Sequence, residues 1–132
     1  MSQNKPIQLG LCCLNITMRE SKPTVFSSRT MIIRTVKEKG IEYLKEKIIQ
    51  NLKDTIKLMQ WNEKNGIKVF RLSSNLFPHK SNPKIDDYTF DFAKPYLKLI
   101  GKLAKKYNQR LTFHPGNIML LVHQIKKCFY KQ

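Results

Sequence analysis

The amino-acid sequence predicts an α/β fold whose strands are parallel and follow the order β-α-β-α-β. Three short apolar segments without helical spacing, residues 7–14, 67–72 and 110–113, alternate with two segments whose apolar residues recur three or four positions apart. Helices between short buried strands favour right-handed crossovers, which place the strands parallel in one sheet. Because parallel sheets are covered on both faces, a sheet of these strands alone is expected to be incomplete.

The first helix is expected from about residue 37 to residue 65. Gly40 weakens its first turn and is a point at which the helix can split, and Asn65-Gly66 is suited to a left-handed cap at its end. Residues 15–35 before it are irregular, and long connections of this kind are often functional. The predicted apolar stripe consists of Ile41, Leu44, Ile48, Leu52, Ile56 and Met59.

The second helix is expected over residues 94–107, where Pro95 is tolerable in the first turn. Residues 73–91 before it are rich in Pro, Ser and Asn and predict a loop. The strand predicted at 67–72 is rich in β-branched and aromatic residues. The buried stripe of the second helix is expected to be Leu97, Ile100, Leu103 and Ala104.

The charge of the chain favours a polyanionic partner. The net charge is +16 and the pI is near 10. Among polyanions, nucleic acid is the usual partner of a protein with such an excess of basic residues. A second explanation stays open, because 20 of the 25 basic residues are Lys and an A/T-rich genome by itself enriches lysine. No apolar run reaches the roughly 18 residues of a membrane span.

The chain is not expected to be secreted. Its first residues lack the charged-then-apolar layout of a signal peptide, which leaves a cytoplasmic, nuclear or viral location. The three cysteines, Cys12, Cys13 and Cys128, are expected to be reduced, small core residues. Adjacent cysteines in a strand point to opposite faces, so Cys12 and Cys13 are not expected to form a metal pair or a disulfide.

Three polar residues follow the three predicted strands: Asn15, His79 and His114. The carboxyl ends of parallel strands meet at one edge, so these side chains are expected to converge there. Two imidazoles suit a divalent metal such as Zn²⁺ or Mn²⁺, which a phosphodiester nuclease uses to activate water and neutralise phosphate. Arg34 and Arg71 are candidate phosphate contacts, with structural salt bridges as the alternative.

The histidine after the third strand has an unusual setting. Pro115 favours an extended conformation at His114, and Gly116 lets the backbone pass close to a ligand. The ordinary alternative for a loop histidine is a solvated or capping residue. The nearby carboxylates, Glu63 and the Asp86-Asp87 pair, are expected to be solvated, which leaves a metal site half built.

The chain resembles the UV-damage endonuclease family from about residue 7 to residue 116. The most specific matches are Phe70-Arg-Leu-Ser-Ser-Asn-Leu-Phe-Pro-His79 and Arg110-Leu-Thr-Phe-His-Pro-Gly116. The other matching segments are Leu9-Gly-Leu-Cys-Cys-Leu-Asn15, Ser28-Arg-Thr-Met31 with Arg34-Thr-Val36, Asn51-Leu-Lys-Asp54, and Trp61-Asn-Glu-Lys-Asn-Gly-Ile67.

The resemblance implies that residues 1–116 are the N-terminal portion of a TIM (β/α)8 barrel that nicks damaged double-stranded DNA 5′ to UV photoproducts, in excision repair, with bound divalent metals (Mn²⁺ or Zn²⁺). It assigns His79 and His114 to the catalytic metal centre and Asn15 to the lesion-binding groove. The remaining metal ligands come from later strands of the family. The chain is therefore expected to be truncated and inactive alone. The alternative hypothesis for the function is a basic nucleic-acid-binding remnant without catalysis. A third hypothesis is a sugar isomerase or other hydrolase on a related barrel.

Departure from the family begins at Asn117. There the family carries a Gln-Tyr or Gln-Phe pair that probes the lesion, and this chain has Asn117-Ile118. With permitted codons, the bases that encode residue 117 onward can be read in another frame as a sequence like that of the family. Residues 117–132 are therefore hypothesised to be a divergent tail that arises from a frameshift.

Overall fold

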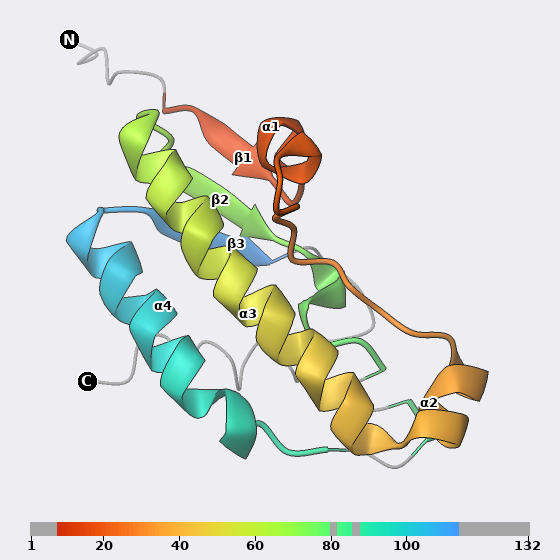
Figure 1. Ribbon diagram of the computed structural model, residues 1–132. Coiled ribbons are helices and arrows are strands. Elements are labelled where there is room, and N and C mark those ends of the chain that lie inside the picture. Colours follow the sequence, from red (N-terminus) through yellow and green to blue (C-terminus); the bar gives the residue numbers. More distant parts are fainter. Residues whose placement is uncertain (1–7, 80–81, 86–87, 114–132) are drawn as a thin grey trace, which may run out of the picture.

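The computed structural model describes residues 8–79, 82–85 and 88–113. Strands β1 (Gly10–Cys12), β2 (Val69–Leu72) and β3 (Arg110–Phe113) form one sheet in the order β1-β2-β3, with both pairs parallel (Figure 1). The predicted α/β class with parallel strands in sequence order is confirmed.

Helices α3 and α4 cover one face of this sheet and lie side by side (Figure 1). On that face, Phe70 and Leu72 of β2 have no measurable exposure, Leu111 of β3 is buried, and Leu11 of β1 is half-buried. Burying side chains of this size stabilises the fold by about 1.5–3 kcal/mol each. The helices are α1 (Ile16–Glu20), α2 (Ile33–Lys39), α3 (Ile41–Lys64) and α4 (Lys94–Lys106), with short 3₁₀ helices η1 (Ser74–Leu76) and η2 (Asp91–Ala93).

The opposite face of the sheet carries a polar row that is open among the described residues. Cys12, Arg71 and Thr112 are register partners and therefore share that face. Cys12 is exposed, and Arg71 and Thr112 are half-buried. A parallel sheet is normally covered on both faces, so this polar row has the position of an interior surface in a larger barrel.

Two predicted segments differ from the structure. The helix expected over residues 37–65 is two helices, α2 and α3, which meet at Gly40 with φ +89°, a conformation that suits glycine. Residues 15–35, expected to be irregular, contain α1 and the start of α2. Helix α1 has only five residues, too few for an apolar periodicity to be recognised.

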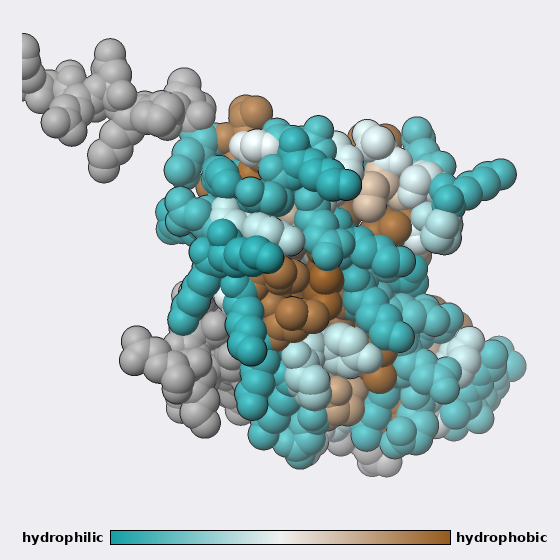
Figure 2. All heavy atoms as spheres, turned by 60° about the vertical axis from the view of Figure 1, so that its left-hand side comes forward, coloured by the Kyte–Doolittle hydropathy of each residue, from teal (hydrophilic) through white to brown (hydrophobic). Residues whose placement is uncertain are grey.

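The surface that Figure 2 presents is mainly hydrophilic, with an apolar region near its centre between long hydrophilic side chains. No helix in the described part of the chain is long and apolar enough to cross a membrane. The large apolar side chains that are exposed are Leu9, Leu14, Ile16, Ile32 and Leu99.

Candidate metal and nucleic-acid site

The candidate site lies where the strands end. Asn15 follows β1, and η1 and the loop that carries His79 follow β2. β3 ends at Phe113, so His114 lies outside the described residues, as does the tail 117–132. Two of the three residues predicted to converge, Asn15 and His79, therefore lie in the described part of the chain, and their convergence stays a prediction.

His79 is half-buried and has φ +59°, a left-handed conformation that is uncommon for residues other than glycine. Its Nε2 bonds the carbonyl oxygen of Met31, and the amide Nδ2 of Asn82 lies 3.3 Å from its Nδ1. Since a carbonyl oxygen only accepts, Nε2 carries a proton, and in the neutral imidazole Nδ1 is then the nitrogen with the lone pair. Metal-binding histidines are commonly oriented by such a bond to a backbone carbonyl.

The backbone just before His79 is held by residues that follow His79 in the chain. The buried hydroxyl of Tyr88 donates to the carbonyl oxygen of Pro78 at 2.8 Å. Tyr88 and Phe77 also belong to the core, and the ring of Phe77 meets Phe90 edge to face at 4.8 Å. The packing of Phe77 and Tyr88 thus holds the backbone next to the imidazole in place.

Asn15 is almost fully buried, with 4% of its surface exposed. Its Oδ1 accepts a hydrogen bond of 3.1 Å from the backbone N–H of Met18, which makes it the N-cap of α1. Its Nδ2 is buried without a hydrogen-bond partner among the described residues. The residue therefore has one structural role and one unsatisfied donor.

Replacing Asn15 by alanine is expected to lower the free energy of unfolding by about 1 kcal/mol, because the N–H of Met18 loses its acceptor. Asn15→Asp retains an acceptor oxygen at the same place and is expected to lose less. Urea unfolding followed by circular dichroism measures both. Equal losses in the two variants would contradict the capping role.

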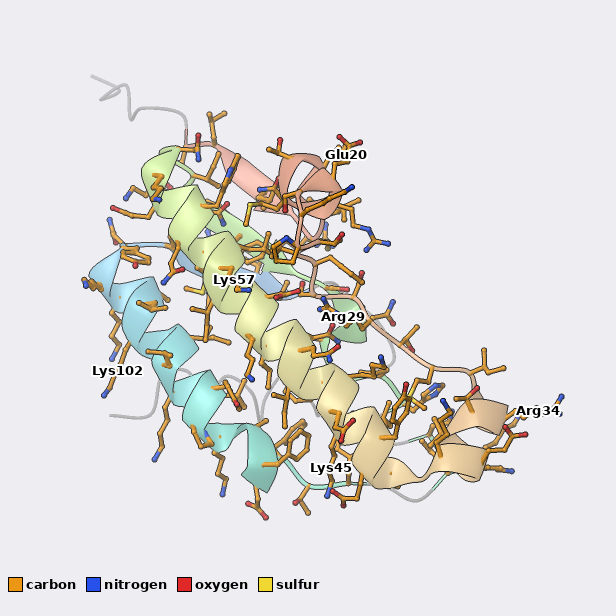
Figure 3. All side chains as sticks on the ribbon, viewed as in Figure 1. Glu20, Arg29, Arg34, Lys45, Lys57 and Lys102 are labelled. Atoms are coloured by element: carbon orange, nitrogen blue, oxygen red, sulfur yellow. The ribbon has the colours of Figure 1, made fainter. Side chains whose placement is uncertain are left out.

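Arg71 and Arg34 have different surroundings. Arg71 is half-buried on the open face of the sheet, and no described carboxylate forms an ion pair with it. Arg34 points outward from α2 and forms an ion pair of 3.0 Å with Glu38, with 83% of its side chain exposed (Figure 3). Salt bridging, the alternative left open for both arginines, is thus present at Arg34.

Cys12 and Cys13 depart from the expectation that they point to opposite faces. The strand ends at Cys12, Cys13 has φ +62°, and Leu14 N–H donates to the Cys12 carbonyl at 2.6 Å. This bond closes a three-residue γ-turn, which brings the two sulfur atoms to 4.0 Å. Burial raises the pKa of the Cys13 thiol to about 11, helped by Cys12 and opposed by the charge of Arg71.

A network that sequence reasoning missed connects residues 26–31 to the middle of α3. Arg29 forms an ion pair of 2.7 Å with Asp54, whose Oδ2 also accepts from the N–H of Phe26 at 3.2 Å. The side chain of Asn51 accepts from the N–H of Arg29 at 2.9 Å and donates to its carbonyl at 3.0 Å. Both partner segments, Ser28–Met31 and Asn51–Asp54, match the family, and that shared match was the only signal.

Asn51 also reaches the second loop of the site. Its Nδ2 lies 3.3 Å from the carbonyl oxygen of Asn75 in η1, just before His79. The segment that it bonds on the other side leads to Met31, whose carbonyl accepts from His79. One buried amide in α3 therefore connects the two segments that orient the imidazole.

Arg19 and Arg29 both lie over the ring of Phe26, at 3.8 and 4.1 Å from its centroid. Each is a cation–π contact. Arg29 also donates to the Phe26 carbonyl at 2.6 Å, and it lies beside α3 in Figure 3. No local pattern in the sequence predicts this cluster, because its three members come together only in the folded loop.

The part of the chain that the structure describes contains no group of three or more His, Cys, Asp or Glu side chains that could hold a metal ion. His79 fits a metal as a single ligand, through Nδ1, because its Nε2 is already bonded to a carbonyl. Glu63 is exposed and pairs with Lys68 at 3.3 Å, as expected for a solvated carboxylate. Asp86 and Asp87 lie outside the described residues.

Comparison with known proteins gives consistent matches. A family model described as UV-endonuclease UvdE matches residues 7–129. A UV-damage endonuclease of Schizosaccharomyces pombe is 48% identical over 117 residues, which cover 86% of this chain and 19% of that protein. A relative from Acanthamoeba polyphaga mimivirus is 46% identical over 123 residues, which cover 92% of this chain and 36% of the viral protein.

A solved structure, the crystal structure of SacUVDE, matches with a TM-score of 0.72 and 23% sequence identity, over 94% of this chain and 41% of that one. That protein is a TIM barrel, so the predicted fold class, part of such a barrel, is confirmed. The chain spans 19–41% of the length of these three relatives. The family match continues past residue 116, and the frameshift origin of the tail stays a prediction.

Proposed function

Because the chain belongs to the UV-damage endonuclease family, we propose that it is the N-terminal part of a metal-dependent DNA-repair endonuclease, which nicks DNA 5′ to UV photoproducts in excision repair. The observation that carries this proposal is the match to the family model over residues 7–129. The substrate is proposed to be damaged double-stranded DNA. The 132 residues by themselves are proposed to bind DNA without cleaving it.

The proposed metal ligands are His79, through its Nδ1, and His114. A bound Mn²⁺ or Zn²⁺ would supply Lewis acidity toward the phosphate and lower the pKa of a bound water. The chain's own contribution at His79 is orientation, since the Met31 carbonyl fixes the protonated nitrogen. The amide of Asn82, 3.3 Å from Nδ1, would have to turn aside.

The proposed DNA contacts are Arg71, Arg34 and Asn15. A guanidinium can hold two phosphate oxygens in a fork, and Arg71 on the open sheet face lacks a described carboxylate that would compete for it. At Arg34 a phosphate would compete with Glu38, an exposed and therefore weak partner. The unsatisfied Nδ2 of Asn15 is a donor available to a ligand only if the loop after β1 shifts.

Binding by the chain is expected to be salt-dependent, and Arg71→Ala is expected to reduce the slope of log K against log salt by about 0.9, the effect of one lost phosphate contact. Arg110→Ala is the matched control, because Arg110 is exposed at the opposite end of the strands. Fluorescence anisotropy with UV-irradiated and unirradiated duplexes measures both variants. Identical slopes for the two variants would contradict a phosphate contact at Arg71.

The same titrations separate the endonuclease proposal from its alternative, a basic nucleic-acid-binding remnant without catalysis. The net charge of +16 favours the remnant, which predicts equal affinity for damaged and undamaged duplex. Tighter binding to the irradiated duplex supports the endonuclease proposal. Nicking of UV-irradiated plasmid that needs both Mn²⁺ and His114 would refute the proposed inactivity of these residues alone.

A further inference from the structure

The two adjacent thiols at the end of β1 form a cluster that the endonuclease proposal does not use. Their sulfur atoms lie 4.0 Å apart, and the γ-turn at Cys13 holds them on the same side of the chain. Cys12 is exposed, and Cys13 is half-buried with its sulfur 3.7 Å from the carbonyl oxygen of Leu72. The pair is therefore open to a ligand at Cys12 and fixed by the sheet at Cys13.

The spacing fits a shared ligand better than a disulfide. A disulfide has about 2.0 Å between its sulfur atoms and usually at least about 4.4 Å between its Cα atoms, whereas adjacent Cα atoms are about 3.8 Å apart, so a disulfide here would be strained. Two sulfur atoms bonded to one shared atom, with bonds of about 2.3 Å, can be at most about 4.6 Å apart. The observed 4.0 Å lies within that reach.

We propose that Cys12 and Cys13 form a two-thiolate binding site for a trivalent, thiophilic arsenic centre. A trivalent arsenic that already carries one carbon substituent needs only two further ligands, so this pair completes its coordination without a third side chain. In the reaction, two S–H bonds and the bond from arsenic to oxygen break, and two As–S bonds form. Both protons leave with the oxygen as water, and no atom changes its oxidation state.

The position of the site gives it a consequence for the polar row on the open sheet face. Cys12 is the register partner of Arg71, and the charge of Arg71 acts on the Cys13 thiol. A bulky substituent on the two sulfurs would therefore stand beside the proposed phosphate contact. The site itself does not rest on the proposed function, since binding can be measured without DNA.

The test uses phenylarsine oxide and the full 132-residue chain under reducing conditions, followed by intact-mass spectrometry and titration of free thiols. The expected result is a one-to-one adduct that consumes two thiols. Cys12→Ser and Cys13→Ser are each expected to weaken binding by about 100-fold, because the second bond no longer forms within one molecule. Cys128→Ser is the control and is expected to bind as the unaltered chain does.

Three outcomes of these measurements would contradict the proposed site. Loss of only one thiol per adduct, or wild-type affinity in Cys12→Ser, overturns the proposal. So does binding that depends on Cys128. A second measurement covers variants that fold poorly: the arsenical should raise the melting temperature of the unaltered chain, because the turn pre-organises the thiols in the folded state. An adduct without that rise contradicts a site made by the fold.

Discussion

Replacing Asp54 by alanine is expected to lower the free energy of unfolding by about 3 kcal/mol. The carboxylate forms the 2.7 Å ion pair with Arg29 and accepts from the N–H of Phe26, and its side chain is only 9% exposed. The variant leaves a guanidinium that is 18% exposed without its counter-charge. The loss is placed at the lower end for buried pairs because Arg29 keeps its contacts to Phe26. Urea unfolding measures it.

The matched control is Glu38→Ala, which breaks the other described arginine–carboxylate pair. That pair is exposed, with 83% of the Arg34 side chain and 59% of the Glu38 side chain in solvent. Its loss is expected to cost about 0.3–0.5 kcal/mol and to vanish in high salt. Similar losses for the two variants would show that the Arg29–Asp54 pair contributes no more than a surface pair.

Replacing Asn51 by alanine is expected to cost about 2–3 kcal/mol. Asn51 has no measurable exposure, and its amide serves both the N–H and the carbonyl of Arg29 and the carbonyl of Asn75. Removing it leaves these backbone groups without their partner. Hydrogen exchange should show that the amide of Arg29 loses its protection, and urea unfolding gives the energy.

Thr55→Val is the control for this variant. Thr55 is equally buried on the same helix, and among the described residues its hydroxyl donates only to the Asn51 carbonyl within α3. Its loss is expected to stay below about 1.5 kcal/mol and to leave the exchange of the Arg29 amide unchanged. Because Asn51 and Asp54 hold the same segment, the double variant should lose less than the sum of the two single losses. Additive losses would contradict a shared network.

Local patterns located the three strands and the two long helices, although β1 and β2 are shorter than the predicted 7–14 and 67–72. Strand β3 coincides with the predicted 110–113, and α4 with the predicted 94–107 to within one residue. Helix α3 ends at Lys64, directly before the Asn65-Gly66 pair that was predicted to cap it, and Gly66 has φ +71°. These features depend on residues close together in the chain, whose apolar spacing and turn chemistry the sequence records directly.

The candidate site was predictable only in its topology. The rule that parallel strands end at one edge places Asn15 and His79 after β1 and β2, as the structure does. The same reasoning could not find that the Met31 carbonyl orients His79, or that Asn15 is a helix cap. Both contacts depend on how the loops fold.

The sequence by itself determined the strand order, the helices between the strands and the family. Only the tertiary structure decided which side chains meet: Arg29 with Asp54, Asn51 with two separate segments, and Cys12 with Cys13. The first two join residues more than 20 positions apart, and no repeating pattern encodes them. The third needs a positive φ at Cys13, which no property of cysteine predicts. Two hydrogen bonds hold this conformation, one from the N–H of Cys13 to the Arg71 carbonyl and one from the N–H of Leu14 to the Cys12 carbonyl.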